Sequence, residues 1–198
     1  MDLRPYATTS FVDDEEPANK KGGWTDQGRG MDLWDFPTGK RLFGGIPFDI
    51  IDPKENESRS CILLASKWRP YFPMAVRGIK MGRRADVLHF LVTAACCRPY
   101  GVEAARFVVH YEDGTKTVIP LVAGVHIGEW WRPTYLSEAR TVWEGLVPRI
   151  RNVFLYSWKN PHPKKVIKTI DFLSVWDGKS DFRIVPALIA ITGEVYER

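Results

Sequence analysis

The sequence predicts an all-β fold of the sandwich or barrel kind. Short apolar runs separated by turn residues follow one another from residue 46 to residue 192. No strand–helix–strand unit of useful length occurs, which argues against an α/β fold. The chain has 198 residues, long for one average domain and short for two. We therefore expect a single domain over residues 1–198, with an irregular N-terminal arm over about residues 1–40.

Alternation of apolar and polar residues defines the expected strands. In the segment RFVVHY, Phe107, Val109 and Tyr111 share one face of a strand, and the residues between them share the other face. The dipeptide Asp113-Gly114 predicts a hairpin that pairs the strands on either side of it, because both residues accept positive φ. The expected strands are Ile46–Ile51, Ser60–Ala65, Val87–Ala95, Ala105–Tyr111, Lys116–Leu121, Thr141–Trp143, Asn152–Trp158, Val166–Val175 and Ile184–Thr192.

One segment, YLSEARTVWEG, could supply a turn or two of helix. Ser137 near its start is a residue type that caps helices well. We expect no other helix in the chain.

Composition and charge exclude several classes of protein. The chain is 44% hydrophobic and 26% charged, and no run of 18 apolar residues occurs, so we expect a packed globule with no membrane partner. The net charge of +4 is spread along the chain, which argues against a nucleic-acid partner. Cys61, Cys96 and Cys97 form neither a disulfide framework nor a CxxC pair. The N-terminal residues lack a secretory signal, so we expect either a cytoplasmic protein or a fragment of a secreted one.

Sequence signs of catalysis are absent. The chain has no GxSxG, HExxH, P-loop or GxGxxG motif. Its four histidines are scattered singly, and we interpret them as hydrogen-bonded structural residues, although three could still converge on zinc or copper. A glycoside hydrolase that pairs Asp26 with Glu129 remains an alternative, because catalytic carboxylates follow no local spacing rule.

An acidic run near the N-terminus offers oxygen ligands. Asp13 and Asp14 begin the run DDEE, and Ca²⁺ takes six to eight oxygen ligands in proteins. The run lacks the spacing of an EF-hand, and a solvated acidic loop is the competing interpretation. Structural calcium at Asp13 and Asp14 is therefore the cofactor that the sequence favours.

The aromatic content is the most unusual feature of the chain, with eight Trp, seven Tyr and ten Phe. In the segment GEWWRP, successive side chains of an extended strand would point to opposite faces, so Trp130 and Trp131 enter one core only if the backbone bends. An indole that faces water offers a flat platform for the C–H face of a sugar ring. The competing role is packing, which we expect for Trp143, Trp158 and Trp176. The candidate ligand-binding residues are Trp24, Asp26, Gln27, Trp34, Trp68, Trp130, Trp131 and Arg132.

Four motifs occur in an order that resembles a known family. They are FGGIPFDIID, VVHYEDGTKTVIPLVAGVHIGEWW, LYSWKNPHPKKVIKTIDFLS and VPALIAIT. Together they resemble the galactose-binding-domain-like β-sandwich modules that accompany bacterial glycoside hydrolases. The resemblance covers about Asp32 to Gly193. The adjacent Cys96 and Cys97 depart from the family pattern, and no catalytic domain is evident in the chain.

The resemblance implies an antiparallel β-sandwich of the jelly-roll type. It also implies a non-catalytic carbohydrate-binding or accessory module, whose partners would be an oligosaccharide or polysaccharide and a glycoside hydrolase domain. We expect such a module to dock a glycan on loop aromatics. A purely structural role, in which an exposed aromatic face drives oligomerisation, is a further alternative.

Overall fold

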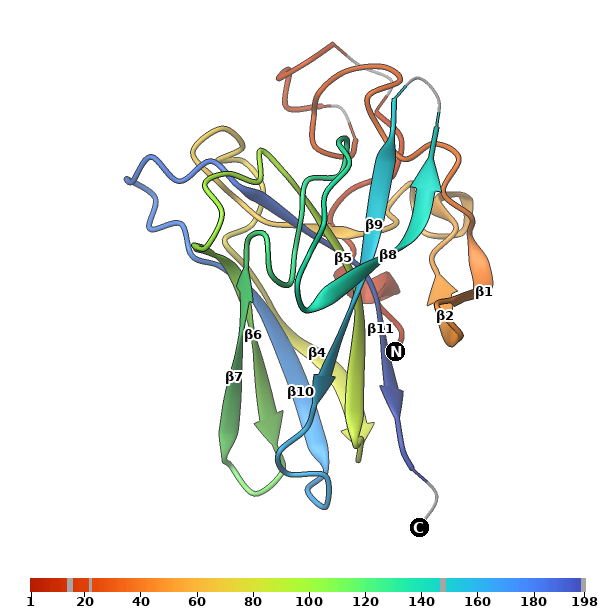
Figure 1. Ribbon diagram of the computed structural model, residues 1–198, viewed down its shortest axis with the longest axis vertical. Helices are drawn as coiled ribbons and strands as arrows, with labels where there is room; N and C mark the ends of the chain where they lie inside the picture. The colour runs from red at the N-terminus through yellow and green to blue at the C-terminus, as the bar shows by residue number, and fades with distance from the viewer. Residues whose placement is uncertain (14–15, 22, 147–148, 197–198) are drawn as a thin grey trace.

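The protein is an antiparallel β-sandwich. The computed structural model describes residues 1–13, 16–21, 23–146 and 149–196. Two large sheets form the sandwich, and a two-stranded hairpin lies outside them (Figure 1). The four-stranded sheet has the order β4 (Ala75–Arg83), β10 (Ile167–Ser174), β6 (Glu103–Tyr111) and β7 (Lys116–Val122). The five-stranded sheet has the order β3 (Ile62–Leu63), β11 (Val185–Glu194), β5 (Val87–Ala95), β9 (Arg151–Lys159) and β8 (Ala139–Gly145).

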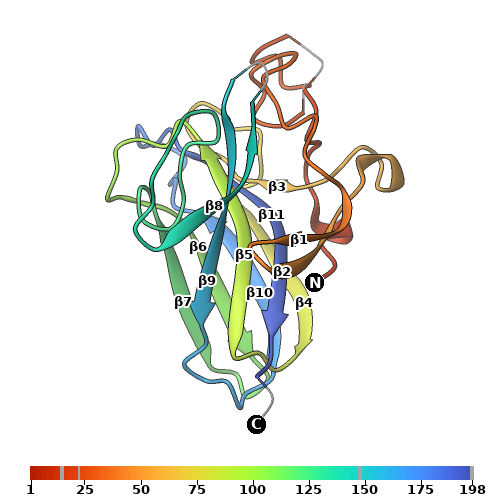
Figure 2. The same ribbon diagram turned by 45° about the vertical axis from the view of Figure 1, so that its right-hand side comes forward.

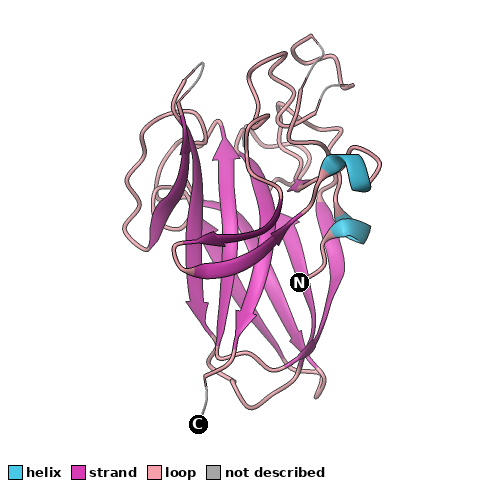
Figure 3. Ribbon diagram, turned by 90° about the vertical axis from the view of Figure 1, so that its right-hand side faces the viewer, coloured by secondary structure: helices cyan, strands magenta, loops and turns pink. Residues whose placement is uncertain are grey.

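The chain passes repeatedly from one large sheet to the other. After β4 it crosses to β5, returns for β6 and β7, crosses again for β8 and β9, and ends through β10 and β11. This alternation is compatible with the expected jelly roll. The only helical segments among the described residues are two short 3-10 turns, η1 (Arg4–Tyr6) and η2 (Pro53–Glu55) (Figure 3). No described helix has the length and apolar character needed to cross a membrane.

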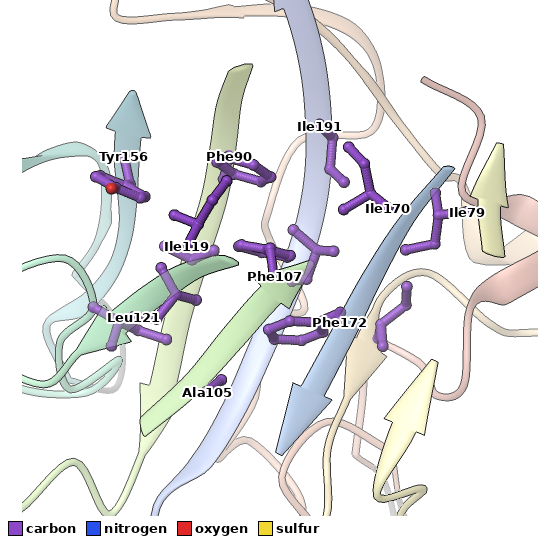
Figure 4. Close-up of a cluster of buried hydrophobic side chains, with 14 of the residues drawn as sticks. Ile79, Phe90, Ala105, Phe107, Ile119, Leu121, Tyr156, Ile170, Phe172 and Ile191 are labelled. Atoms are coloured by element: carbon purple, nitrogen blue, oxygen red, sulfur yellow. The ribbon is translucent and has the colours of Figure 1, made fainter. Parts of the chain in front are cut away.

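The main core lies between the two large sheets. Phe107 on β6 stacks on Phe90 of β5 at a centroid distance of 4.2 Å and on Phe172 of β10 at 4.8 Å (Figure 4). The alternation predicted for β6 is confirmed, since Phe107, Val109 and Tyr111 are buried on the inner face. Because apolar side chains from both sheets meet here, this layer holds the sandwich together.

A second core covers the other face of the five-stranded sheet. We call it the arm core; its largest side chains are Phe11, Trp24, Phe36 and Trp130, all at most 4% exposed. The N-terminal arm supplies the first three, and the hairpin of β1 (Gly39–Phe43) and β2 (Ile46–Ile50) continues the cover beside β11 (Figure 2). The arm is irregular, as predicted, yet it forms a third layer. Every residue of β5 is buried, so the side chains on both faces of this strand need packing partners, and the arm supplies those on the outer face.

The predicted hairpin is confirmed. β6 pairs with β7 antiparallel, with Val108 opposite Val118, and Gly114 in the turn has φ +85°. The predicted strands agree with β2, β5, β6, β7, β9, β10 and β11 to within a few residues. The strand expected over Ser60–Ala65 is shorter, because only Ile62–Leu63 pair regularly with β11.

The helix expected at residues 135–145 was wrong. Ala139–Gly145 form strand β8, which pairs antiparallel with β9 and includes the short strand expected over Thr141–Trp143. Its β-branched and aromatic residues favour an edge strand over a helix. Strands β1 and β4 were not predicted. In β4, Gly78 and Gly82 have positive φ and the pairing with β10 shifts register, so the apolar alternation is interrupted.

Four connections gather at the end of the sandwich opposite the C-terminus (Figure 1). They follow β3, β5, β7 and β10 and span residues 64–74, 96–102, 123–138 and 175–184. Because neighbouring strands run antiparallel, these four loops all lie at the same end of the sandwich, which we call the rim. Loops at the end of a sandwich are where binding residues concentrate.

Candidate binding site

A cavity of about 280 Å³ lies among the four rim loops, and we call it the rim pocket. Each of the four loops contributes to its lining. The lining residues are Trp68, Cys96, Arg98, Tyr100, Glu129, Trp131, Arg132 and Arg183. The pocket therefore combines three of the predicted binding residues, Trp68, Trp131 and Arg132, with others that lie far away in the sequence.

Each aromatic ring of the rim pocket has a guanidinium beside it. The Cζ atom of Arg98 lies 5.0 Å from the ring centroid of Tyr100, and that of Arg183 lies 5.1 Å from the ring of Trp68. Trp131 has two such neighbours, Arg132 at 5.7 Å and Arg149 at 5.3 Å. These distances are those of cation–π contacts. The rings and the guanidiniums therefore form one mixed surface around the pocket.

The double tryptophan is split by a turn in the backbone. The amide N–H of Trp130 donates to the carbonyl of Ala94 at 2.9 Å, which fixes this residue at the end of β5. Trp130 is 1% exposed and packs edge-on against Trp24 in the arm core, at 5.6 Å. Trp131 stacks on Trp130 with the planes 12° apart and the centroids 6.0 Å apart, and it lines the rim pocket. The bend that the sequence required is thus present, and it leaves only the second indole partly open to solvent.

Glu129 is the buried acid of the rim pocket and is 7% exposed. Its Oε2 accepts the backbone N–H of Cys97 at 2.9 Å, whereas its Oε1 has no hydrogen-bond partner in the described structure. Burial raises the pKa of Glu129 to about 7, and the bond from Cys97 and the charges of Arg132 and Arg98 offset part of that rise. At neutral pH this carboxyl is near the midpoint of its titration.

Cys96 lies beside Glu129 but is not an activated thiol. Burial, with the charge of Glu129 as a smaller cause, raises the pKa of Cys96 to about 11. The thiol is therefore protonated at neutral pH, and a protonated thiol is a poor nucleophile.

Three of the predicted binding residues are buried. Trp24 and Asp26 are fully buried and Trp130 nearly so, which favours a packing role for them, and the binding role expected for these residues stays a prediction. Both indoles pack against other rings of the arm core, Trp24 against Phe11 and Trp130, and Trp130 against Trp24. Asp26 accepts hydrogen bonds from the hydroxyl of Tyr71 and from the backbone N–H of Lys20, which ties two loops together.

Two further candidates lie in the arm, apart from the rim pocket. Gln27 is half-buried and donates through Nε2 to the hydroxyl of Thr25 at 2.7 Å. Trp34 is 56% exposed, and the guanidinium of Arg151 lies 5.9 Å from its ring centroid. Neither residue lines the rim pocket.

The calcium prediction stays a prediction. Asp13 is buried and its Oδ2 accepts the N–H of Gly28 at 2.8 Å, whereas Asp14 lies outside the described residues. In the described ranges, no group of three His, Cys, Asp or Glu side chains is arranged to hold a metal ion. Three of the histidines have side-chain partners: His89 contacts Ser157, His110 contacts Asp171, and His126 contacts Glu138.

Sequence reasoning missed half of the rim pocket. Arg98, Tyr100 and Arg183 carry no periodic pattern, and their contribution follows only from the convergence of loops. Glu129 was noted as a carboxylate beside the double tryptophan, but its burial could not be seen. A local signal existed for Arg98 and Tyr100, because they lie in the short loop that follows a strand buried along its whole length.

Comparisons with known proteins give no name for this arrangement: no family model and no curated protein matches the chain.

Proposed function

We propose that the protein is a non-catalytic carbohydrate-binding or accessory module of the galactose-binding-like kind, and that it docks a glycan in the rim pocket. The observation that carries the proposal is the lining of the rim pocket, where Trp68, Tyr100 and Trp131 stand beside Glu129, a buried carboxyl whose Oε1 has no partner among the described residues. A buried acceptor without a partner is uncommon, and a hydroxyl group of a ligand would satisfy it.

The other groups of the rim pocket suit a sugar as well. A pyranose ring has C–H faces, which pack on indole, and an edge of hydroxyls, which bond to charged groups. Trp131 and Trp68 are partly open to solvent and supply the flat surfaces. Arg98 and Arg132 supply donors for ring and hydroxyl oxygens.

The proposed docking is reversible and of modest affinity. The rim pocket is small and open to solvent at Trp68, which is 48% exposed, so little apolar area is removed from water on binding. Dissociation constants on the order of 10 μM to 1 mM follow for a short oligosaccharide. Such values suit a module that holds a partner, such as a glycoside hydrolase domain, near a polysaccharide with many equivalent sites.

A catalytic role is the alternative, and it needs a second carboxyl group. Glycoside hydrolases place two carboxyls about 5 to 9 Å apart across the scissile bond. Among the described residues that line the rim pocket, Glu129 alone carries one, and Asp26 is committed to the arm. We therefore favour binding over turnover.

Calorimetric titration of a broad glycan panel tests the proposal. We expect at least one glycan to bind the wild-type protein, and Trp131→Ala and Trp68→Ala to weaken it at least tenfold. Trp34→Ala is the matched control, because it removes an exposed indole outside the rim pocket. Absence of heat with every glycan, or equal loss in Trp34→Ala and Trp131→Ala, would contradict docking in the rim pocket. Turnover of a chromogenic glycoside that Glu129→Gln abolishes would favour the hydrolase instead.

A further inference from the structure

The charges around the rim pocket are strongly unbalanced. Three of its lining residues are arginines, Arg98, Arg132 and Arg183, and a fourth, Arg149, lies over the ring of Trp131. Among the described residues that line the pocket, Glu129 alone carries a carboxyl group. A neutral sugar needs donors and acceptors in comparable numbers, because each hydroxyl both donates and accepts. An excess of guanidiniums therefore points to a ligand with negative charge.

Two of these arginines form no ion pair with any described residue, and the buried carboxyl of Glu129 feels the charge of both. In the part of the chain that the structure describes, the guanidiniums of Arg98 and Arg132 lie over the rings of Tyr100 and Trp131 and are not within ion-pair distance of a carboxylate. Arg183 differs, because it pairs with Asp181 at 2.6 Å, a carboxylate that Lys67 also contacts. The rim pocket is thus lined by two unpaired guanidiniums, and they come from two different loops.

The aromatic partners make these guanidiniums suitable for a planar anion. A guanidinium held over a ring loses less side-chain freedom when a ligand arrives, and its N–H groups remain able to bond in pairs to a carboxylate. The same rings that hold the arginines are the surfaces on which a sugar ring would lie. A sugar that carries its own carboxylate satisfies both features at once.

The carboxyl group of Glu129 does not strongly repel an anionic ligand. Its pKa is raised to about 7 by burial, so much of the population carries no charge at pH 7. The neutral carboxyl can donate a hydrogen bond to the ligand, whereas the ionised form can only accept one. The groups that face Glu129 from the neighbouring loops are Cys96, Cys97, Arg98 and Arg132, and the two arginines keep the pocket positive in either state.

We infer that the rim pocket takes an acidic sugar, a hexuronic acid unit of an oligosaccharide, with Arg98 and Arg132 bound to its carboxylate and Trp131 beneath its ring. This inference rests on the proposed function and narrows its ligand class. The anionic group is assigned as a carboxylate because paired guanidinium bonds match a planar acceptor.

The test compares acidic oligosaccharides with neutral partners of the same backbone. The probes are trisaccharides of galacturonate, mannuronate and glucuronate, the carboxyl-reduced form of each, and a sulfated trisaccharide. In calorimetry at low salt we expect at least one uronate to bind tenfold or more tightly than its carboxyl-reduced form. Raising the salt from 50 to 500 mM should weaken the uronate severalfold and leave the neutral form unchanged, because salt screens exposed charges.

Variants of Arg98 and Arg132 test whether these residues cause the preference for the uronate. Arg98→Gln and Arg132→Gln should each reduce the preference for the uronate at least threefold, with little change for the neutral form. Arg98→Lys keeps the charge and should recover only part of the preference, since an ammonium cannot form the paired bonds. Arg84→Gln is the matched control, because Arg84 is an exposed arginine in the turn between β4 and β5, at the other end of the sandwich.

The outcomes separate this inference from the proposed function. If neutral glycans bind in the rim pocket as tightly as every uronate, the acidic ligand is refuted and the docking function stands. Tighter binding of the sulfated trisaccharide than of any uronate would overturn the carboxylate assignment. If no glycan binds, acidic or neutral, both proposals fail.

Discussion

The arm core and the rim pocket are both built from aromatic side chains, yet their rings have different neighbours. In the arm core, Trp24 and Trp130 contact other aromatic rings and are at most 1% exposed. In the rim pocket, Trp68 and Trp131 contact guanidiniums and remain partly exposed. The abundance of rings therefore does not distinguish the two regions, whereas the exposure of the indoles and the guanidiniums beside them do.

The boundary between the two regions runs through a single peptide bond. Trp130 and Trp131 are adjacent and their rings stack, but only Trp130 belongs to the arm core as a fully buried side chain. Trp130→Ala should therefore reduce mainly the stability of the fold, whereas Trp131→Ala should reduce mainly the affinity for a ligand.

Trp130→Ala should give the largest loss of stability. Removing a buried indole leaves a cavity against Trp24, and such truncations cost about 3 to 5 kcal/mol. Trp131→Ala should cost about 1 kcal/mol or less, because its ring already borders the pocket. Urea unfolding followed by far-UV circular dichroism measures both. Equal losses in the two variants would show that the rings share one core and that the division is wrong.

Glu129→Gln should stabilise the protein in a pH-dependent way. The pKa of Glu129 rises from its ordinary value of 4.5 to about 7 in the folded state, so folding favours the protonated form. The contribution of Glu129 to wild-type stability is therefore greatest below pH 4.5, falls as the pH rises toward 7, and is level above that. The variant stays neutral, and its advantage should grow from near zero at pH 4.5 to about 3 kcal/mol at pH 8.

Unfolding free energies of the wild type and Glu129→Gln at pH 4.5, 6, 7 and 8 provide the measurement. Glutamine keeps an oxygen that can accept the N–H of Cys97, so this contact is not a source of the difference. A gap between the two proteins that does not change with pH would mean that Glu129 is ionised throughout the range.

The sheets were predictable from the sequence because alternation is a local signal. β6 and β7 follow from the apolar pattern and from Asp113-Gly114, and β5 follows from its apolar run. The arm core was not predictable, because Trp24 lies in a segment with no period, where nothing local distinguishes a buried indole from an exposed one. The rim pocket depends on the meeting of four loops, so Trp131 was identified from its context while Arg183 and the burial of Glu129 were not.

Asp35→Asn should have a smaller effect, at the edge of the arm core. Arg151 is 1% exposed and pairs with Asp35 at 2.6 Å, while its guanidinium lies 5.7 Å from the ring of Trp143. Removing the partner of a buried charge destabilises a protein, but Asp35 is partly exposed and water can replace it. We expect a loss of about 1 to 2 kcal/mol in urea unfolding, with glycan affinity unchanged. A loss of affinity would extend the binding surface to the arm.

Trp34→Ala should have the smallest effect and gives the sharpest test of the comparison. Trp34 combines features of both regions, since its ring is 56% exposed and a guanidinium lies beside it, yet that guanidinium belongs to the buried Arg151. If an arginine neighbour alone marked a binding ring, Trp34 would bind a ligand. The additional requirement is that the ring lines the rim pocket, and Trp34 does not. We therefore expect a change within about 0.5 kcal/mol in stability and no change in calorimetric affinity for a glycan.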